Sequence, residues 1–426
     1  MTHETAWHRV REQLGDVRKV EILVGIPTFN NAPTVEHVVK TIVAGLGKSF
    51  PHASVLVVNS DAGSQDATPE AVKQAVAKSI PTALVQHLAG GFHPGPFSLH
   101  TLSESGVPGR EQAFRAFFRI TEELQAKACV VVDANVRSVT PDWMEFLLQP
   151  VIEKSADFVA PLFRRPRYEG SLTNSIVYPM SRALYGKRIR CQSGGGYGFS
   201  RKLSSLYLSK DVWEGEAARF GIDTWLTSVA VAEGQEVYQA FLGAKIQDSK
   251  LSGVDLSMVL AQAVGAVFHY MEEYQDVWED KKGSSPVPLF GPSYEQATET
   301  VTINVERLVN GFRQGLRDLL PIWEIILAPE TLAGILPLGL LDVDEFHFPM
   351  PLWVQTVYDC ALAYHEKVLH REHLLKSLTP LYLGRTASLV LETRQGGPKE
   401  VEGAIETLCE TFESMKPYLT QRWRFQ

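Results

Sequence analysis

The sequence predicts an α/β fold in which a doubly wound, mainly parallel sheet is followed by an all-helical C-terminal part. Up to about residue 250, short apolar runs alternate with segments in which apolar residues recur every three or four positions. From about residue 251 onward, long amphipathic segments are separated by joints rich in proline and glycine. Strands and helices that alternate at this spacing form a parallel sheet with right-handed crossovers. We therefore expect two domains, residues 1–250 and residues 251–426.

The expected elements follow this alternation along the chain. Apolar runs predict strands at residues 20–26, 54–59, 83–87 and 128–132. Helical periodicity predicts helices at residues 33–46, 68–77 and 110–124. Thr140 is expected to cap a further helix that begins at Pro141. In the C-terminal part, helices are expected at residues 256–271, 294–319, 354–369 and 399–415. Each of the first three helices thus connects two successive strands.

Composition, net charge and cysteine spacing indicate which classes of protein and partner fit this chain. The chain has 426 residues, of which 45% are hydrophobic, which suits a globular core. Its net charge of -8 argues against nucleic acid or an anionic membrane as the main partner. The N-terminal residues lack the apolar core of a signal peptide, and glutamates and prolines interrupt residues 319–341, so no membrane span is expected. The cysteines lack paired or metal-type spacing, which predicts reduced thiols and a cytoplasmic location: Cys129, Cys191, Cys360 and Cys409.

Polar residues follow several of the predicted strands. Residues 26–31 read Ile-Pro-Thr-Phe-Asn-Asn after the first strand, and residues 61–68 form a turn rich in Gly, Asp and Ser after the second. Arg110 stands at a helix start, where backbone N–H groups and the helix dipole favour a phosphate. Parallel sheets bind ligands outside the carboxyl ends of their strands. Each segment alone also fits a capped turn or a solvated loop, so only their combination predicts a binding site.

The fourth predicted strand ends in Asp133-Ala134-Asn135, which differs from an Asp-x-Asp motif by one amide. Two carboxylates at such a strand end can hold a divalent cation together with a nucleotide diphosphate. Replacing one carboxylate about 4 Å from the cation removes roughly 4 kcal/mol for each cation charge, at an effective dielectric constant near 20. Tight metal binding by the protein alone is therefore not expected.

Further motifs occur in a fixed order along the chain. They are Ile-Pro-Thr-Phe-Asn at 26–30, the turn at 61–68, Pro-Gly-Arg at 108–110, Asp-Ala-Asn at 133–135, Phe-Arg-Arg-Pro at 163–166, Gly-Gly-Gly-Tyr at 194–197, Phe-Gly-Ile-Asp-Thr at 220–224, and Phe-Pro-Met-Pro-Leu-Trp at 348–353. Together they resemble the GT-A glycosyltransferases, and most closely the retaining enzymes that make mannosylglycerate and glucosyl-3-phosphoglycerate. The resemblance covers almost the whole chain and implies the GT-A fold.

The resemblance also implies roles for individual residues. Asp223 would orient the acceptor, and Arg110 would stand where a lysine meets the donor diphosphate. Nucleotide-sugar contacts would come from Pro27, Phe29, Asn30, Asp61, Arg110, Asp133, Gly195 and Lys245. Acceptor contacts would come from Arg164, Arg165, Gly194 and Asp223. The relatives carry an acidic residue where this chain has Gly196, which would remove one contact to sugar hydroxyls.

The metal ligands of the relatives are altered in this chain. Asn135 occupies the position of a ligating carboxylate, and Gln247 occupies that of a histidine, with Asp248 as a nearby substitute ligand. Three alternatives stay open. A divalent metal, Mg²⁺ or Mn²⁺, binds together with the donor phosphates. Alternatively, Arg110, Lys245 and Lys250 neutralise the diphosphate without metal. In the third alternative, the site is inactive or has another use.

The expected function is transfer of glucose or mannose from a nucleotide-diphosphate sugar to a small hydroxy acid, such as glycerate or 3-phosphoglycerate, with retention of anomeric configuration. A homodimer is also expected. Two alternatives stay open: a non-catalytic nucleotide-sugar-binding protein, and a glycosyltransferase with another acceptor and inverting chemistry. A nucleotidyltransferase is excluded, because residues 27–30 do not form its glycine-rich phosphate loop. The Gly/Pro-rich residues 90–97 are a candidate lid, and His93 in them is a loop residue rather than a ligand.

Overall fold

The protein is described by a computed structural model that covers residues 10–76, 80–87, 107–190, 194–210, 213, 221–247, 255–292 and 303–424. The chain divides into two compact units that are interleaved in sequence. Unit 1 comprises Met1–Arg164, Ile189–Gly253 and Val287–Gln296, and unit 2 comprises Arg165–Arg188, Val254–Pro286 and Ala297–Gln426. The expected division at residue 250 lies close to one of these crossings. Sequence periodicity gave no sign that residues 165–188 group with the C-terminal helices.

Unit 1 contains a mainly parallel sheet, as predicted. Its strand order is β10-β8-β5-β7-β4-β1-β2-β3, and β7 runs antiparallel to both of its neighbours. The strands are β1 (Ile22–Thr28), β2 (Val55–Asp61), β3 (Thr82–Gln86), β4 (Ala128–Val132), β5 (Phe158–Arg164), β7 (Gly196–Ser200), β8 (Val237–Ala244) and β10 (Leu289–Phe290). The chain moves outward from β1 through β2 to β3 and then returns to the other side of β1 with β4. The predicted fold class, a doubly wound α/β sheet with a C-terminal helical region, is confirmed.

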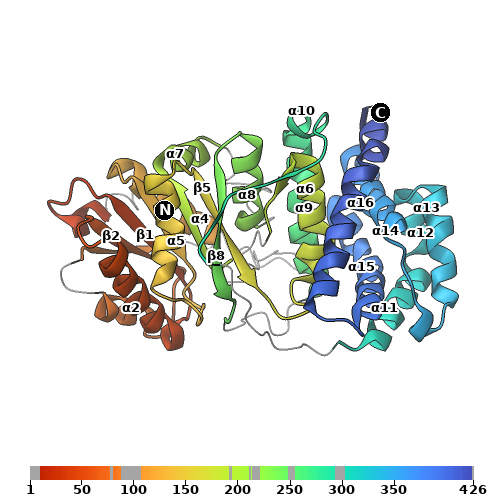
Figure 1. Ribbon diagram of the computed structural model, residues 1–426, viewed down its shortest axis with the longest axis horizontal. Coiled ribbons are helices and arrows are strands. Elements are labelled where there is room, and N and C mark those ends of the chain that lie inside the picture. The colour runs from red at the N-terminus through yellow and green to blue at the C-terminus, as the bar shows by residue number, and fades with distance from the viewer. Residues whose placement is uncertain are drawn as a thin grey trace. The chain divides into compact units, whose positions relative to one another are not determined.

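Helices cover both faces of this sheet (Figure 1). One face packs against α2 (Ala32–Ser49) and α5 (Asp142–Glu153), and the other packs against α4 (Arg110–Glu123), which also contacts α7 (Arg201–Ser209). The remaining helices of unit 1 are α3 (Thr68–Ala75) and α8 (Ile222–Ala232). The predicted cap at Thr140 is only partly right. Its backbone carbonyl accepts from Trp143 N–H, whereas no side chain caps α5.

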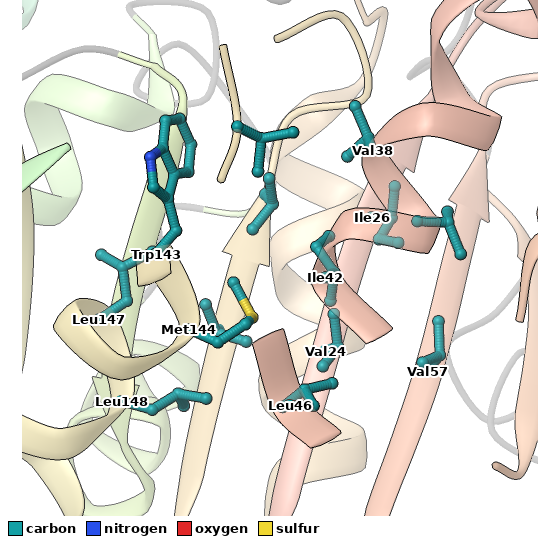
Figure 2. Close-up of a cluster of buried hydrophobic side chains, with 14 of the residues drawn as sticks. Val24, Ile26, Val38, Ile42, Leu46, Val57, Trp143, Met144, Leu147 and Leu148 are labelled. Atoms are coloured by element: carbon teal, nitrogen blue, oxygen red, sulfur yellow. The ribbon is translucent and has the colours of Figure 1, made fainter. Parts of the chain in front are cut away.

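The core beneath α2 and α5 is a continuous apolar cluster, and Figure 2 shows part of it. The labelled side chains come from two strands and both helices: Val24, Ile26, Val38, Ile42, Leu46, Val57, Trp143, Met144, Leu147 and Leu148. Helix α2 can approach α5 closely because Gly45 has no side chain. A Cβ atom at Gly45 would lie only 2.2 Å from the carbonyl oxygen of Pro141.

The first two strands extend beyond their predicted ends. Pairing continues through Pro27 with Ser60 and Thr28 with Asp61, although these residues are not the apolar ones that defined the predicted strands. The reason is a buried polar pair, because Thr28 Oγ1 donates to Asp61 Oδ2 over 2.7 Å. This bond lets two polar side chains remain inside the sheet.

In its described residues, unit 2 is helical apart from a short pairing of β6 (Lys187–Arg188) with β9 (Ser285–Pro286). Its elements are η1 (Thr173–Val177), α6 (Tyr178–Tyr185), α9 (Leu256–Glu273), α10 (Gln275–Trp278), α11 (Val305–Asp318), α12 (Leu320–Ile326), α13 (Pro329–Ile335), η3 (Leu336–Leu340), η4 (Val343–Glu345), α14 (Met350–Glu366), α15 (Arg371–Thr393) and α16 (Pro398–Arg424). None of the helices within the described ranges is both long and apolar enough to cross a bilayer.

Helix α15 was not predicted, although it is long. It buries serine, threonine and arginine side chains beside its leucines, and it contains Pro380, so its apolar residues do not form one clear stripe. Buried hydrogen bonds allow this pattern, for example from Arg385 Nη1 to the carbonyl of Phe348 over 3.1 Å. The four predicted C-terminal helices correspond to α9, α11, α14 and α16. Residues 293–302, the predicted start of the second, lie outside the described residues.

Candidate functional site

The strand order places a topological switch point between β1 and β4. Within the sheet, β2 and β3 follow β1 on one side, and β4 is the neighbour of β1 on the opposite side. At such a point the loops that leave the carboxyl ends of the two strands diverge, and a ligand can bind between them. Several of the predicted site residues follow β1 and β4, among them Phe29, Asn30 and Asp133. The carboxyl edge of the sheet at this point is therefore the candidate site.

Asp133 directly follows β4 and is tied to the glycine turn before β7. Its N–H donates to Gly195 O over 3.0 Å, and Gly195 N–H donates to Asp133 Oδ2 over 2.7 Å. Gly195 has φ +95°, and a Cβ atom there would lie 2.5 Å from the ring of Phe163. Only glycine fits this position, because both the backbone conformation and the space exclude a side chain.

Arg110 joins Asp133 to a second carboxylate. Gly109, in a left-handed conformation with φ +61°, leads into α4, and Arg110 is the first residue of that helix. Arg110 Nη2 lies 2.8 Å from Asp133 Oδ1 and 3.3 Å from Asp223 Oδ1. The side chains of Arg110 and Asp133 are each 1% exposed. A guanidinium buried between two carboxylates is electrostatically costly, and its position at the carboxyl end of a sheet makes it a candidate for a functional site.

Tyr197 completes the arrangement. Its Oη donates to Asp223 Oδ1 over 2.7 Å and accepts from Gly194 N–H over 2.8 Å. Burial, followed by the charge of Asp223, raises the pKa of Tyr197 well above its ordinary value, so the hydroxyl remains a donor. These contacts form a closed circuit, which we call the polar ring. Its members are Arg110, Asp133, Gly194, Gly195, Tyr197 and Asp223.

The carboxylate of Asp61 is occupied by the turn that follows β2. Its Oδ2 accepts from Thr28 Oγ1 over 2.7 Å and from Ser64 Oγ over 2.6 Å. Its Oδ1 accepts from the N–H groups of Gly63 over 2.9 Å and Ser64 over 2.7 Å. A carboxylate offers about four acceptor positions, so these donors saturate it. In this structure Asp61 therefore holds the turn, and its predicted ligand contact stays a prediction.

The residues after β1 form the other side of the switch point. Pro27 is buried within β1, whereas Phe29 and Asn30 in the following turn are only partly buried. Asn30 has φ +50°, its N–H donates to Ser64 Oγ over 2.8 Å, and its Oδ1 accepts from Gln65 N–H over 2.8 Å. The turns after β1 and β2 are thus bound to each other. Of the predicted pocket residues, Phe29 and Asn30 are better exposed to a ligand than Pro27.

The structure places Asn135 and Gln247, the two predicted metal-ligand positions, in neighbouring segments. Val136 forms an antiparallel bridge with Gln247, which places Gln247 beside the strand exit that contains Asn135. Arg137 N–H donates to Ile246 O over 2.8 Å in the same pairing. Asn135 is 1% exposed, and Gln247 Oε1 is buried without a hydrogen-bond partner. The role of Asn135 and Gln247 at a metal position stays a prediction, and Asp248 lies outside the described residues.

The donor atoms here do not fit a divalent metal. Mg²⁺ and Mn²⁺ bind to oxygen ligands that include carboxylates. Asn135 and Gln247 offer only neutral amides, and Asp133 already faces Arg110 and Gly195 N–H. Across the ranges that the structure describes, no group of three or more His, Cys, Asp or Glu residues is arranged to hold a metal ion.

Lys245 follows β8 and is nearly buried. Its Nζ lies 5.5 Å from the ring centroid of Phe163, the same ring that Gly195 approaches. Its N–H donates to Arg164 O over 3.1 Å. Lys245, which is predicted to contact the nucleotide sugar, therefore lies next to the glycine turn of the polar ring.

The predicted acceptor arginines do not belong to one compact unit. Arg164 ends β5 in unit 1, whereas Arg165 belongs to unit 2, where it packs beside Gly170. Their joint role stays a prediction. At Gly196, a Cβ atom would lie 3.1 Å from Leu147 in helix α5. An acidic side chain there would point into the apolar core, so the expected loss of a sugar contact at Gly196 is not supported.

Sequence reasoning missed His87, which supports the turn before Arg110. His87 Nε2 lies 2.8 Å from Pro108 O, and Nδ1 lies 2.9 Å from Ser60 Oγ. Because a carbonyl only accepts, Nε2 carries the proton and Nδ1 accepts from the serine hydroxyl. Burial lowers the pKa of His87, in keeping with a neutral ring. The available signal was a histidine at the end of an apolar strand. Tyr197 was also missed, because its hydroxyl binds Asp223, which lies 26 residues away in the sequence.

The fold and the site together define a class of protein. Unit 1 is an open, mainly parallel α/β sheet with a buried arginine, two carboxylates and a glycine turn at the carboxyl edge of its strands. Sheets of this class bind ligands at that edge.

Comparisons with known proteins give the following similarities. Neither a known protein family nor a curated protein matches the sequence. A solved structure of glucosyl-3-phosphoglycerate synthase from Mycobacterium tuberculosis, in complex with Mn²⁺, UDP-glucose and phosphoglyceric acid, is 17% identical with a TM-score of 0.43, over 62% of this chain and 84% of that chain. The same enzyme with phosphoglyceric acid is 18% identical with a TM-score of 0.41, over 65% and 86% of the two chains. A further mycobacterial protein is 18% identical with a TM-score of 0.42, over 60% and 75%. The enzyme named here is of the type that the sequence motifs resemble.

Proposed function

We propose that this chain is a glycosyltransferase that moves a hexose, glucose or mannose, from a nucleotide-diphosphate sugar to a small acceptor that bears a carboxylate or phosphate. One observation carries the proposal. Arg110 stands at the first position of α4, at the carboxyl edge of the sheet, and contacts both Asp133 and Asp223. A helix start with a guanidinium favours an anionic group such as a diphosphate.

In this proposal the donor lies across the switch point between β1 and β4. Its base and ribose contact Phe29 and Asn30 on one side and Asp133 on the other. Its diphosphate meets Arg110 and Lys245, whose positive charges stabilise the leaving group as negative charge develops on it. The glycine turn at Gly194 and Gly195 supports this arrangement, because its N–H groups hold Tyr197 and Asp133 in place beside Arg110.

The transfer proceeds with retention of anomeric configuration. The bond between the sugar C1 and the diphosphate oxygen breaks, the acceptor oxygen forms a bond to C1 on the same face, and the acceptor proton passes to the leaving diphosphate. Asp223 orients the acceptor rather than deprotonating it. In support, Asp223 Oδ1 already accepts from Tyr197 Oη and lies 3.3 Å from Arg110 Nη2. These contacts hold the Asp223 side chain in one orientation, which an orienting role requires.

The acceptor is a hydroxy acid of the size of glycerate or 3-phosphoglycerate. The basic residues Arg164 and Arg165 suit a carboxylate or phosphate, because a guanidinium binds such groups through paired hydrogen bonds. We further propose that the protein acts in the cytoplasm as a homodimer. The buried free thiols of Cys129 and Cys360 suit a reducing compartment, and size-exclusion chromatography with light scattering tests the dimer.

Turnover of defined substrates tests the proposal. Purified protein is given UDP-glucose or GDP-mannose with D-glycerate or 3-phosphoglycerate, and free nucleotide is measured. We expect release that depends on one of the acceptors. NMR of the first-formed product should show the anomeric configuration of the donor, and an inverted linkage would overturn retention. Tight binding of nucleotide sugar without release under any acceptor would instead identify a non-catalytic binding protein.

A further inference from the structure

The polar ring leads to an inference about how the proposed donor is bound. We propose that Arg110 takes the place of a divalent metal, so that this chain binds the diphosphate of its donor without Mg²⁺ or Mn²⁺. The inference rests on the proposed function, because it concerns the same donor. It goes beyond that function by naming the cation that the site uses.

The first argument is the charge at the expected metal position. Asn135 and Gln247 lie beside each other across the Val136–Gln247 bridge, and both are uncharged. A dication placed there would have Asp133 as its one charged partner within this group. That carboxylate is already engaged on both oxygens, by Arg110 at 2.8 Å and by Gly195 N–H at 2.7 Å. A metal would have to displace Arg110 and then remain next to it.

The second argument is the balance of charge in the site. Arg110 and Lys245 bring two positive charges, and Asp133 and Asp223 bring two negative charges. The described members of the cluster are therefore close to neutral without any metal. Buried charges are tolerated when they are paired in this way, whereas an added dication would be uncompensated until the donor bound.

The third argument is the position of Arg110 itself. It is the first residue of α4, the end at which the helix dipole is positive, and Gly109 precedes it in a left-handed conformation. His87 holds the preceding turn through Pro108 O. A guanidinium offers a planar set of N–H donors that matches two phosphate oxygens. Of the two contacts of Arg110, the one to Asp223 is the longer, at 3.3 Å. A diphosphate oxygen could replace Asp223 there while the ion pair between Arg110 and Asp133 stays intact.

Direct binding measurements test the inference. UDP and UDP-glucose are titrated calorimetrically into the full-length protein in EDTA and, separately, in Mn²⁺, with GDP and GDP-mannose as the second donor pair. We expect the Kd values in the two conditions to agree within about threefold. At a fully metal-dependent site, the two Kd values would differ by more than about a hundredfold. Binding that appears only with Mn²⁺ overturns the inference and leaves the proposed function standing. Absence of binding in both conditions overturns both.

Variants in α4 identify the cation. Arg110→Gln should weaken UDP binding at least a hundredfold, and Mn²⁺ should not restore it, because Asn135 and Gln247 stay neutral. Arg119→Gln is the matched control, since Arg119 lies in the same helix, is 58% exposed and pairs with Glu123. It should leave the Kd unchanged.

The conservative variant Arg110→Lys keeps the test valid if Arg110→Gln does not fold. It keeps the charge and loses the planar fork, so UDP should bind about tenfold more weakly, equally with EDTA and with Mn²⁺. Recovery of wild-type affinity by Mn²⁺ in either variant would show that the metal can bind at this site, and it would overturn the inference.

Discussion

Each unit of the protein contains a buried arginine between two carboxylates, and the two arginines differ in what surrounds them. In unit 1, Arg110 contacts Asp133 and Asp223. In unit 2, Arg182 donates from Nη1 to Glu406 over 2.7 Å and from Nε to Glu413 over 2.6 Å. Both arginine side chains are at most 1% exposed. Ion pairing and burial of the arginine therefore do not distinguish a functional site from a structural one.

Their positions in the fold do distinguish them. Glu406 and Glu413 both belong to α16, are 45% and 16% exposed, and bind α16 to α6. Asp133 and Asp223 instead lie at the end of a strand and in the first turn of a helix, next to a glycine turn. The carboxyl edge of a parallel sheet is where ligands bind, whereas a contact between two helices needs no ligand. We therefore expect Arg110 to affect binding and Arg182 to affect stability.

The largest expected effect is that of Arg110→Gln on turnover. Removing the guanidinium takes away the ion pairs that Arg110 forms with Asp133 and Asp223, and it removes the stabilisation of the leaving diphosphate. We expect kcat/KM for nucleotide release to fall about a thousandfold, which corresponds to about 4 kcal/mol of transition-state stabilisation. Steady-state assays with near-ultraviolet circular dichroism as a folding check measure it. Wild-type turnover by a folded Arg110→Gln protein would contradict the expectation that Arg110 has a functional role.

Arg182→Gln should have the next largest effect, on stability alone. Loss of Arg182 leaves Glu413 partly buried without its partner, and we expect the free energy of unfolding to fall by about 3 kcal/mol. Urea unfolding followed by circular dichroism measures this change. Arg188→Gln is the control, because Arg188 lies 3.9 Å from Glu406 and is 42% exposed, so its loss should cost less than about 1 kcal/mol. A fall in turnover per folded molecule for Arg182→Gln would contradict the comparison.

Tyr197→Phe should have a smaller effect, confined to the acceptor side of the reaction. The ring keeps its stacking on Phe158, at 6.0 Å between centroids, while Asp223 loses a hydrogen bond to its charged oxygen. Such a bond contributes about 1.5 kcal/mol, so we expect kcat/KM for the acceptor to fall about tenfold while donor affinity stays near wild type. Tyr207→Phe is the control, because Tyr207 Oη donates to the backbone at Leu226 O. An equal loss of turnover in both variants would mean that Tyr197 has only a structural role.

The last effect concerns Glu111, which follows Arg110 in α4, and it depends on pH. Burial raises the pKa of Glu111 to about 6, from an ordinary value of 4.5. The folded state therefore holds this proton more tightly than the unfolded state. This group's contribution to stability is greatest below about pH 4.5, falls as pH rises to about 6, and is constant above that.

Glu111→Gln removes this penalty. We expect a gain in the free energy of unfolding of up to about 2 kcal/mol at pH 7 and little change at pH 4.5, measured by urea unfolding across this range. Glu123→Gln in the same helix is the control, because the Glu123 side chain is 32% exposed and pairs on the surface with Arg119. If the pH dependence of Glu111→Gln equals that of wild type, the buried carboxyl is not the titrating group.

Much of unit 1 could be predicted because local pattern and burial agree there. The strand at β4 was predicted residue for residue, since Ala128–Val132 is apolar throughout and fully buried. Strand ends were less predictable, because Thr28 and Asp61 continue the sheet through a mutual hydrogen bond between residues far apart in sequence. Helix α15 was missed for a related reason, as its buried polar side chains depend on tertiary partners.

The candidate site was predictable as a set of segments but not as a set of contacts. The sequence by itself determined the alternation of strands and helices and the place of Arg110 at a helix start, because periodicity and capping act over a few residues. It also shows directly that positions 135 and 247 hold amides, Asn135 and Gln247. Only the tertiary structure decided that Arg110 lies between Asp133 and Asp223, that Tyr197 closes the ring, and that Asp61 is saturated by its own turn. These contacts join segments more than 20 residues apart or depend on exact side-chain geometry. Their energies depend on burial, which no local pattern specifies.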